Sequence, residues 1–146
     1  MPVYAGQALT AGQLNRMQPR PYLAEASGNL IASTTYQPIP GCSLVAPSTV
    51  AGATWTATGI FDCTVTTVHA TNLMVGRLLV NGASQTGLAI HAMDTTDRDT
   101  VAMVWSGTLG AAGSNTFAME GVVNGASGNG TFQSYSRLAV TITEPV

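Results

Sequence analysis

Several stretches after residue 22 place apolar residues at every second position, which is the period of a β-strand with one buried face. The longest run is ATWTATGIFDCTV at residues 53–65, and two others are TVAMVWSGTL at residues 100–109 and SRLAVTITE at residues 136–144. Successive side chains of a strand point to opposite faces, so each run predicts one face turned toward a core. The predicted inward residues are Ala53, Trp55, Ala57, Phe61, Cys63, Val65, Val101, Met103, Trp105, Leu109, Leu138, Val140 and Ile142.

Turn signals separate these runs from further strand candidates at residues 30–36, 73–80, 87–93 and 116–123. Asn81-Gly82 and Asn124-Gly125 favour tight turns, and no helical period occurs after Pro21. Strands that recur roughly every 8 to 15 residues without intervening helices are typical of antiparallel sandwiches. We therefore predict an all-β protein, with residues 22–146 forming one antiparallel, jelly-roll-like β-sandwich.

The stretch LMVGRLLV at residues 73–80 carries apolar residues on both of its faces. A strand in a two-sheet domain buries one face against the other sheet, so a second apolar face needs another cover. Two interpretations stay open at this point. The outer face contacts another subunit, or a loop of the same chain covers it.

The segment LTAGQLNRMQP, residues 9–19, has the pattern of a short helix with a defined start. Thr10 is a suitable N-cap, Gln13 completes a capping box, and Leu9 and Leu14 occupy the positions of a hydrophobic staple. Pro19 ends the helix, which is therefore predicted at residues 11–17. A helix this short is marginal in water and needs a surface to dock on. We predict that residues 1–21 form a docking arm with the site residues Leu9, Thr10, Leu14, Met17 and Pro19.

Charged residues make up only 8% of the 146-residue chain, and lysine is absent. A formal net charge of −2 without a basic cluster argues against a nucleic-acid-binding protein. No apolar run approaches the roughly 20 residues that span a bilayer, and we expect a soluble protein made in a cytoplasm. Exposed sheet edges are commonly protected by lysines and other charges, so we expect neighbouring subunits to cover the edges here.

No arrangement of residues predicts a catalytic, metal or cofactor site. Neither a GxSxG nor an HExxH motif is present, and His69 and His91 lie far apart in the sequence. The acidic stretch DTTDRD, residues 94–99, offers oxygen ligands for calcium, but a solvated loop in which Arg98 pairs with one of these aspartates is the favoured interpretation. We expect no enzyme activity and no cofactor.

The positions of the cysteines and tryptophans indicate structural roles. Cys42 and Cys63 are predicted as two buried thiols, with a disulfide between neighbouring strands as the alternative. Trp55 and Trp105 occupy inward positions and are predicted in the core. A carbohydrate-binding module would instead present an aromatic residue such as Tyr36 or Tyr135 in an exposed groove.

The leader AGQALTAGQLNRMQP resembles the short pattern AGxxLTAxxLN at the start of tail and other virion-associated proteins of tailed bacteriophages. The body, with VGRLLVNG, DRDTVAMVWSGTLGAAGSNTF and RLAVTITE, resembles small Thr- and Gly-rich β-sandwich modules encoded among the structural genes of phages and prophages of high-GC hosts such as actinobacteria. The residues that match the leader are Ala5, Gly6, Leu9, Thr10, Ala11, Leu14 and Asn15.

This resemblance implies a non-enzymatic virion structural protein that is trimeric and exposed on the particle. We expect a capsid decoration or cement protein, because the chain is one small domain without the long shaft of a complete tail fibre. The alternative is a minor tail or fibre-tip protein that binds the host surface through a carbohydrate. The expected partners are further copies of the chain, as a homotrimer, and the major capsid protein or a tail protein of the same virion. No nucleic acid or membrane is expected as a partner.

Overall fold

Strand β4 is the centre of the larger of two antiparallel sheets in the computed structural model, which describes residues 8–125 and 129–146. One edge of β4 pairs with β8, and the other edge pairs first with β11 and then with β10. This sheet, here called sheet A, contains β1 (Arg20–Glu25), β2 (Leu30–Ile31), β4 (Thr54–Thr67), β8 (Arg98–Thr108), β10 (Asn129–Phe132) and β11 (Arg137–Thr143).

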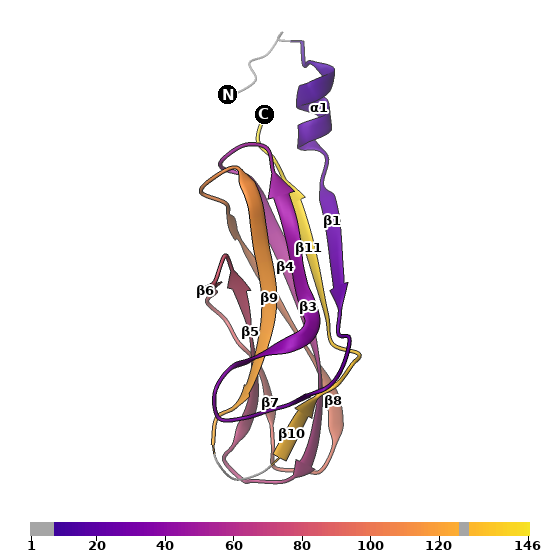
Figure 1. The fold of residues 1–146 in the computed structure, drawn as a ribbon, viewed down its shortest axis with the longest axis vertical. Helices are drawn as coiled ribbons and strands as arrows, with labels where there is room; N and C mark the ends of the chain where they lie inside the picture. The colour runs from indigo at the N-terminus through magenta and orange to yellow at the C-terminus, as the bar shows by residue number, and fades with distance from the viewer. Residues whose placement is uncertain (1–7, 126–128) are drawn as a thin grey trace.

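The second sheet, sheet B, packs against sheet A and has the order β3-β9-β5-β6, with β7 also pairing with β5. Successive long strands alternate between the two sheets, which produces an elongated sandwich (Figure 1). The all-β, jelly-roll-like prediction is therefore confirmed. Sheet B contains β3 (Gln37–Ser48), β5 (Leu73–Val80), β6 (Ala83–Ser84), β7 (Ala89–Ala92) and β9 (Gly113–Val123).

The alternation in the three longest runs correctly predicts the inward faces. Every predicted inward residue is buried except Val101 and Met103, which are half-buried against the core. Trp55 packs edge-on against Phe117 with ring centroids 5.4 Å apart, and Trp105 packs against Phe61 at 6.4 Å. Both tryptophans therefore belong to the core, as predicted.

Two glycines that face each other create the space for the largest side chains between the sheets. Gly76 on β5 lies opposite Gly121 on β9, and the rings of Phe61 and Phe132 from sheet A fill the space beside them. The two rings lie 6.0 Å apart in an edge-on arrangement. A Cβ at either glycine would come within 2.3 Å of one of these rings, so neither position has room for a side chain.

The outer face of β5 is partly covered by Tyr36, from the segment before β3. Tyr36 lies over the guanidinium of Arg77 at 3.7 Å, Arg77 pairs with Glu120 on β9, and Val75 is only 6% exposed. The loop interpretation is thus confirmed for part of this face. The same face, with Leu73, Val75 and Arg77, lines an apolar groove of about 720 Å³. The lining also includes the exposed side chains of Leu88 and Ile90. The interpretation of a subunit contact is not tested for this groove.

Cys42 and Cys63 are buried free thiols, so the disulfide alternative is wrong. Cys42 lies on β3 in sheet B and Cys63 on β4 in sheet A. Burial raises the pKa of Cys42 to about 11 and that of Cys63 to about 12. Both side chains therefore remain protonated near neutral pH and act as small apolar groups.

We predict that Gly76→Ala destabilises the fold by about 1–3 kcal/mol, because its methyl group would collide with the ring of Phe61 in a packed core. Chemical denaturation followed by tryptophan fluorescence measures this. The matched control is Gly28→Ala, since no atom lies within 4 Å of the added Cβ, and we expect a change of less than about 0.5 kcal/mol. Equal unfolding midpoints for the two variants would contradict the packing argument.

Candidate functional site

Helix α1 (Ala11–Met17) has the predicted bounds and the predicted capping box. The Thr10 hydroxyl oxygen accepts a hydrogen bond from the Gln13 backbone N–H at 3.2 Å, and the Thr10 N–H donates to Gln13 Oε1 at 2.8 Å. These two bonds satisfy donors that a helix start otherwise leaves to water. The local sequence thus contains a complete helix start.

The apolar side chains of α1 contact little of the molecule. The helix has no buried residue; Leu14 is 49% exposed and Met17 is 41% exposed, one turn apart on the same side. Leu9 is half-buried, and Pro19 is exposed between the helix and β1. Figure 1 shows that α1 projects beyond one end of the sandwich. The predicted docking residues Leu9, Leu14 and Met17 therefore lie in an accessible arm, and docking itself stays a prediction.

An ionic cluster at the base of the arm, here called the arm clamp, holds the chain where α1 leads into β1. The buried carboxylate of Glu144 accepts hydrogen bonds from the Thr49 N–H and hydroxyl, each at 2.6 Å, and pairs with Arg20. Arg20 and Pro21, assigned to the arm from sequence, already pair with β11. The clamp joins the first strand, the β3–β4 loop and the end of the last strand, so it orients the arm relative to the sandwich.

The clamp lowers the pKa of Glu144. Burial alone raises the pKa of this carboxyl, but hydrogen bonds from Thr49 and the pairing with Arg20 act in the opposite direction and prevail. A carboxyl with a lower pKa in the folded than in the unfolded state stabilises the fold above its unfolded pKa. This stabilisation is lost as the pH falls through the folded-state pKa.

The outer face of sheet A carries no charge along most of its length. One row across four strands consists of Leu23, Ala139, Thr58 and Val104, in which Leu23 and Val104 are 61% and 58% exposed. The pair Glu25–Arg137 marks one limit of this surface. The surface, here called the uncharged face, consists of Pro21, Leu23, Thr54, Thr56, Thr58, Ile60, Ala102, Val104, Ser106, Thr108, Ala139, Thr141 and Thr143.

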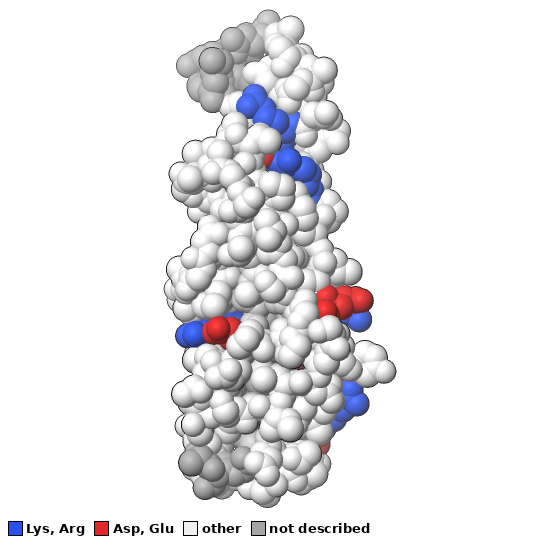
Figure 2. All heavy atoms as spheres, viewed as in Figure 1, with Lys and Arg blue, Asp and Glu red and all other residues white. Residues whose placement is uncertain are grey.

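Strand β8 borders the uncharged face and exposes a long sheet edge. Its 11 residues pair with β4 alone among the described strands, and between Thr100 and Thr108 they include neither a charge nor a proline. Such an edge is a template for pairing with another chain. Figure 2 shows that charged side chains are also sparse on the face of the molecule seen there.

The loop between β7 and β8, which carries Asp94 and Asp97, lies at the end of the sandwich opposite the arm (Figure 1). Arg98 forms two hydrogen bonds with the buried carboxylate of Asp62, at 2.6 and 2.9 Å. The prediction that Arg98 pairs with an aspartate of its own loop is therefore wrong. The register of β4 and β8 explains the difference, because it places Asp62 opposite Thr100, diagonal to Arg98 across the ladder.

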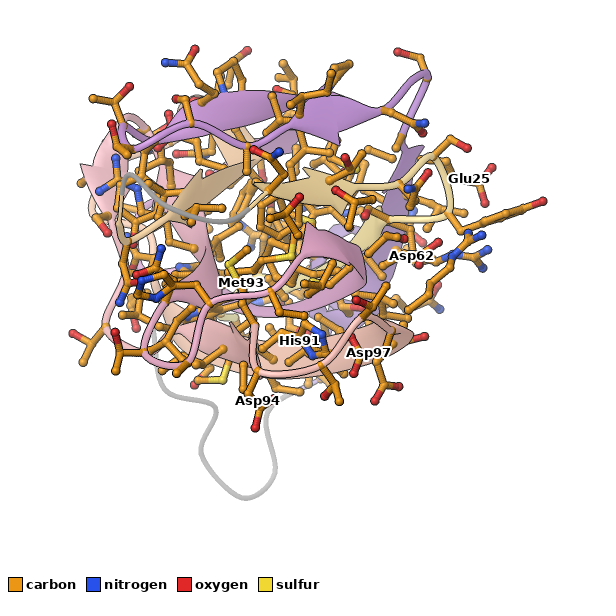
Figure 3. All side chains as sticks on the ribbon, turned by 90° about the horizontal axis from the view of Figure 1, so that it is seen from below. Glu25, Asp62, His91, Met93, Asp94 and Asp97 are labelled. Atoms are coloured by element: carbon orange, nitrogen blue, oxygen red, sulfur yellow. The ribbon has the colours of Figure 1, made fainter. Side chains whose placement is uncertain are left out.

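The acidic loop does not assemble a cluster of metal ligands. His91 Nε2 lies 3.0 Å from Asp97 Oδ1, while Asp94 points away from this pair (Figure 3). Within residues 8–125 and 129–146, no group of three or more His, Cys, Asp or Glu side chains could hold a metal ion. The same residues contain no helix long and apolar enough to cross a membrane.

The two tyrosines considered for carbohydrate binding differ in exposure. Tyr36 is half-buried against Arg77 at the groove of sheet B. Tyr135 is 67% exposed and lies 5.3 Å from the guanidinium of Arg98. Sequence reasoning could name Tyr135 as a candidate, but the diagonal contact that brings Asp62 and Arg98 beside it has no local sequence signal.

No protein-family model matches this sequence, and no curated protein matches it either. Among solved structures, the Eiger TNF from S. frugiperda is 9% identical, with 86% of this chain and 93% of that chain covered and a TM-score of 0.53. Dimeric latent PorU from Porphyromonas gingivalis is 10% identical with a TM-score of 0.51. The match includes 86% of this chain but only 13% of the PorU chain. At these identities the likeness shows the β-sandwich fold alone.

We predict that Glu144→Gln destabilises the protein by about 1–3 kcal/mol at pH 7, because it leaves Arg20 without its anionic partner. The difference from wild type should shrink as the pH falls below about 4.3, the ordinary pKa of a glutamate, because the Glu144 carboxyl then takes up a proton more readily in the unfolded state than in the folded one. Urea denaturation at a series of pH values measures this.

The control for this experiment is Glu25→Gln. It removes the same charge from a side chain that is 61% exposed and lies 3.9 Å from Arg137. We expect this substitution to change the free energy of unfolding by less than about 1 kcal/mol at any pH. A Glu144→Gln deficit that stays constant from pH 7 to pH 3 would show that the charge of the clamp contributes nothing.

Proposed function

We propose that this protein is a virion structural protein of a tailed phage, a homotrimeric capsid decoration or cement protein that attaches to the particle through its N-terminal arm. The observation that carries this proposal is helix α1, which is capped at its start, has no buried residue and exposes Leu14 and Met17. A seven-residue helix is too short to be stable in isolation, so a surface that receives its apolar side supplies the missing stability.

The arm clamp favours attachment rather than a loose tail. Arg20, Thr49 and Glu144 hold the exit of the arm against the sandwich, and Pro19 restricts the backbone just before it. A segment that is already ordered loses less conformational freedom on binding. Many copies on a repeating lattice would then hold the particle surface through many modest contacts.

The uncharged face supports self-association. It offers no charge to attract an acidic or basic partner, and it is continuous with the unprotected edge of β8. A second copy of the chain, with the same lack of charge, fits such a surface without burying unpaired ions. We therefore assign the contact between subunits to the uncharged face.

We predict that Leu14→Asp lowers occupancy on particles at least tenfold, because docking would bury an unpaired carboxylate. The measurement is the amount of protein retained on phage particles that lack it, after mixing with purified variants. Gly12→Asp is the matched control, since it adds the same charge to an open position of the same helix. Equal occupancy for wild type and Leu14→Asp would contradict the role of the arm.

Deletion of residues 1–18 tests the same role without a new charge. The clamp and β1 begin after the deletion, so we expect an unchanged thermal transition of the sandwich together with loss of particle binding. Loss of folding would instead make the arm part of the structural core.

We predict that Val104→Asp converts the trimer to monomers, because the substitution places a charge in the middle of the uncharged face. Light scattering coupled to size-exclusion chromatography measures the mass. Leu88→Asp, at a 44% exposed position of the sheet B groove, is the control and should remain trimeric. A trimeric Val104→Asp together with a monomeric Leu88→Asp would show that the subunits meet at the groove instead.

A minor tail or fibre-tip protein is the second candidate, and the exposed ring of Tyr135 is the observation that favours it. Immunogold labelling of particles separates the two roles. Label at regular positions over the head supports decoration, whereas label confined to the tail tip supports the alternative.

A further inference from the structure

The turn that carries Tyr135 is held rigidly on both sides. Before it, the Gln133 N–H donates to the Asp62 carbonyl at 2.8 Å, and the Ser134 N–H donates to Asn29 Oδ1 at 2.9 Å. After it, the buried hydroxyl of Ser136 accepts the Asp62 N–H at 3.1 Å. An exposed aromatic residue on a fixed backbone is preorganised for contact with a ligand, since little freedom remains to be lost.

The guanidinium of Arg98 lies beside this ring in a fixed position. Arg98 lies 5.3 Å from it and is itself held by the two hydrogen bonds to Asp62, whose side chain is 7% exposed. Because Tyr135 is 67% exposed, the guanidinium leaves most of the side chain open to solvent. The cation–π contact thus orients the ring without covering it.

Two hollows share Tyr135 as a common wall. One, of about 350 Å³, is lined by Asp62, Arg98, Asp99, Thr100 and Tyr135. The other, of about 270 Å³, is lined by Glu25, Ala26, Ser134, Tyr135, Ser136 and Arg137. Each hollow offers carboxylate acceptors beside guanidinium donors, and both lie at or below the small end of the range for ligand pockets.

We propose that Tyr135 and these two hollows bind a neutral saccharide. One sugar ring stacks on Tyr135, and the adjoining sugars of the saccharide reach into the hollows. Each sugar hydroxyl can donate to a carboxylate and accept from a guanidinium, and the C–H face of a sugar ring packs against an aromatic ring. Three carboxylates line the hollows against two guanidinium groups, so a polyanion is disfavoured. The inference does not depend on the arm or on the virion role.

The experiment is an array of neutral oligosaccharides built from hexoses, pentoses and N-acetylhexosamines, followed by NMR titration of the purified full chain with the tightest-binding one. We expect Tyr135→Ala to lower the affinity for this oligosaccharide at least tenfold. The affinity of Tyr135→Phe should stay within about threefold of wild type, because stacking uses the ring and not its hydroxyl. Tyr36→Ala is the matched control, since it removes the other tyrosine beside an arginine, and should bind normally. Thermal melts establish that each variant is folded.

Four results would overturn the proposal. They are failure of every neutral oligosaccharide to bind at millimolar concentration, unchanged binding by Tyr135→Ala, preference for sulfated oligosaccharides on the same array, and a lower oligomeric mass of Tyr135→Ala. The last would make Tyr135 a subunit contact. Leu14→Asp should bind the oligosaccharide like wild type, so a failure of the arm proposal leaves this result unaffected.

Discussion

The packing of Phe61 and Phe132 beside Gly76 and Gly121 sets the relation between the two sheets. The glycines lie opposite one another on β5 and β9, and the rings from sheet A occupy the space that side chains would otherwise fill. Interiors are packed to the density of organic crystals, so this contact tolerates neither a larger residue in sheet B nor a smaller one in sheet A. The contact therefore fixes how closely β4 and β10 approach β5 and β9.

Strand β11 connects that position to the arm clamp and to the turn that carries Tyr135. It pairs with β4 along its whole length, beginning just after Tyr135 and ending just before Glu144. The arm clamp therefore lies at one end of this strand, and the two hollows around Tyr135 lie at the other. If the protein attaches to a particle through α1, as proposed, Tyr135 lies beyond the end of β11 that is farther from the attachment point, which is compatible with both proposals.

The features that sequence reasoning predicted correctly depend on short-range rules. The capping box of Thr10 and Gln13 and the bounds of α1 involve residues three or four apart, and the inward faces of β4 and β11 involve residues two apart. The partner of Arg98 was predicted wrongly, because Asp62 is separated from it by 36 residues and meets it only through the register of β4 and β8. The same holds for the arm clamp, in which Glu144 meets Arg20 and Thr49 from distant parts of the chain.

The sequence by itself determined the all-β class, the buried face of each long strand, the short capped helix and the scarcity of charge on the surface. Local backbone preferences and side-chain alternation decide these features before any strand finds its partner. The tertiary structure alone decided which strands share an edge, and therefore which residues surround Tyr135, anchor Glu144 and form the uncharged face. Pairing between distant strands depends on how the whole core packs, and no short stretch of sequence contains that information.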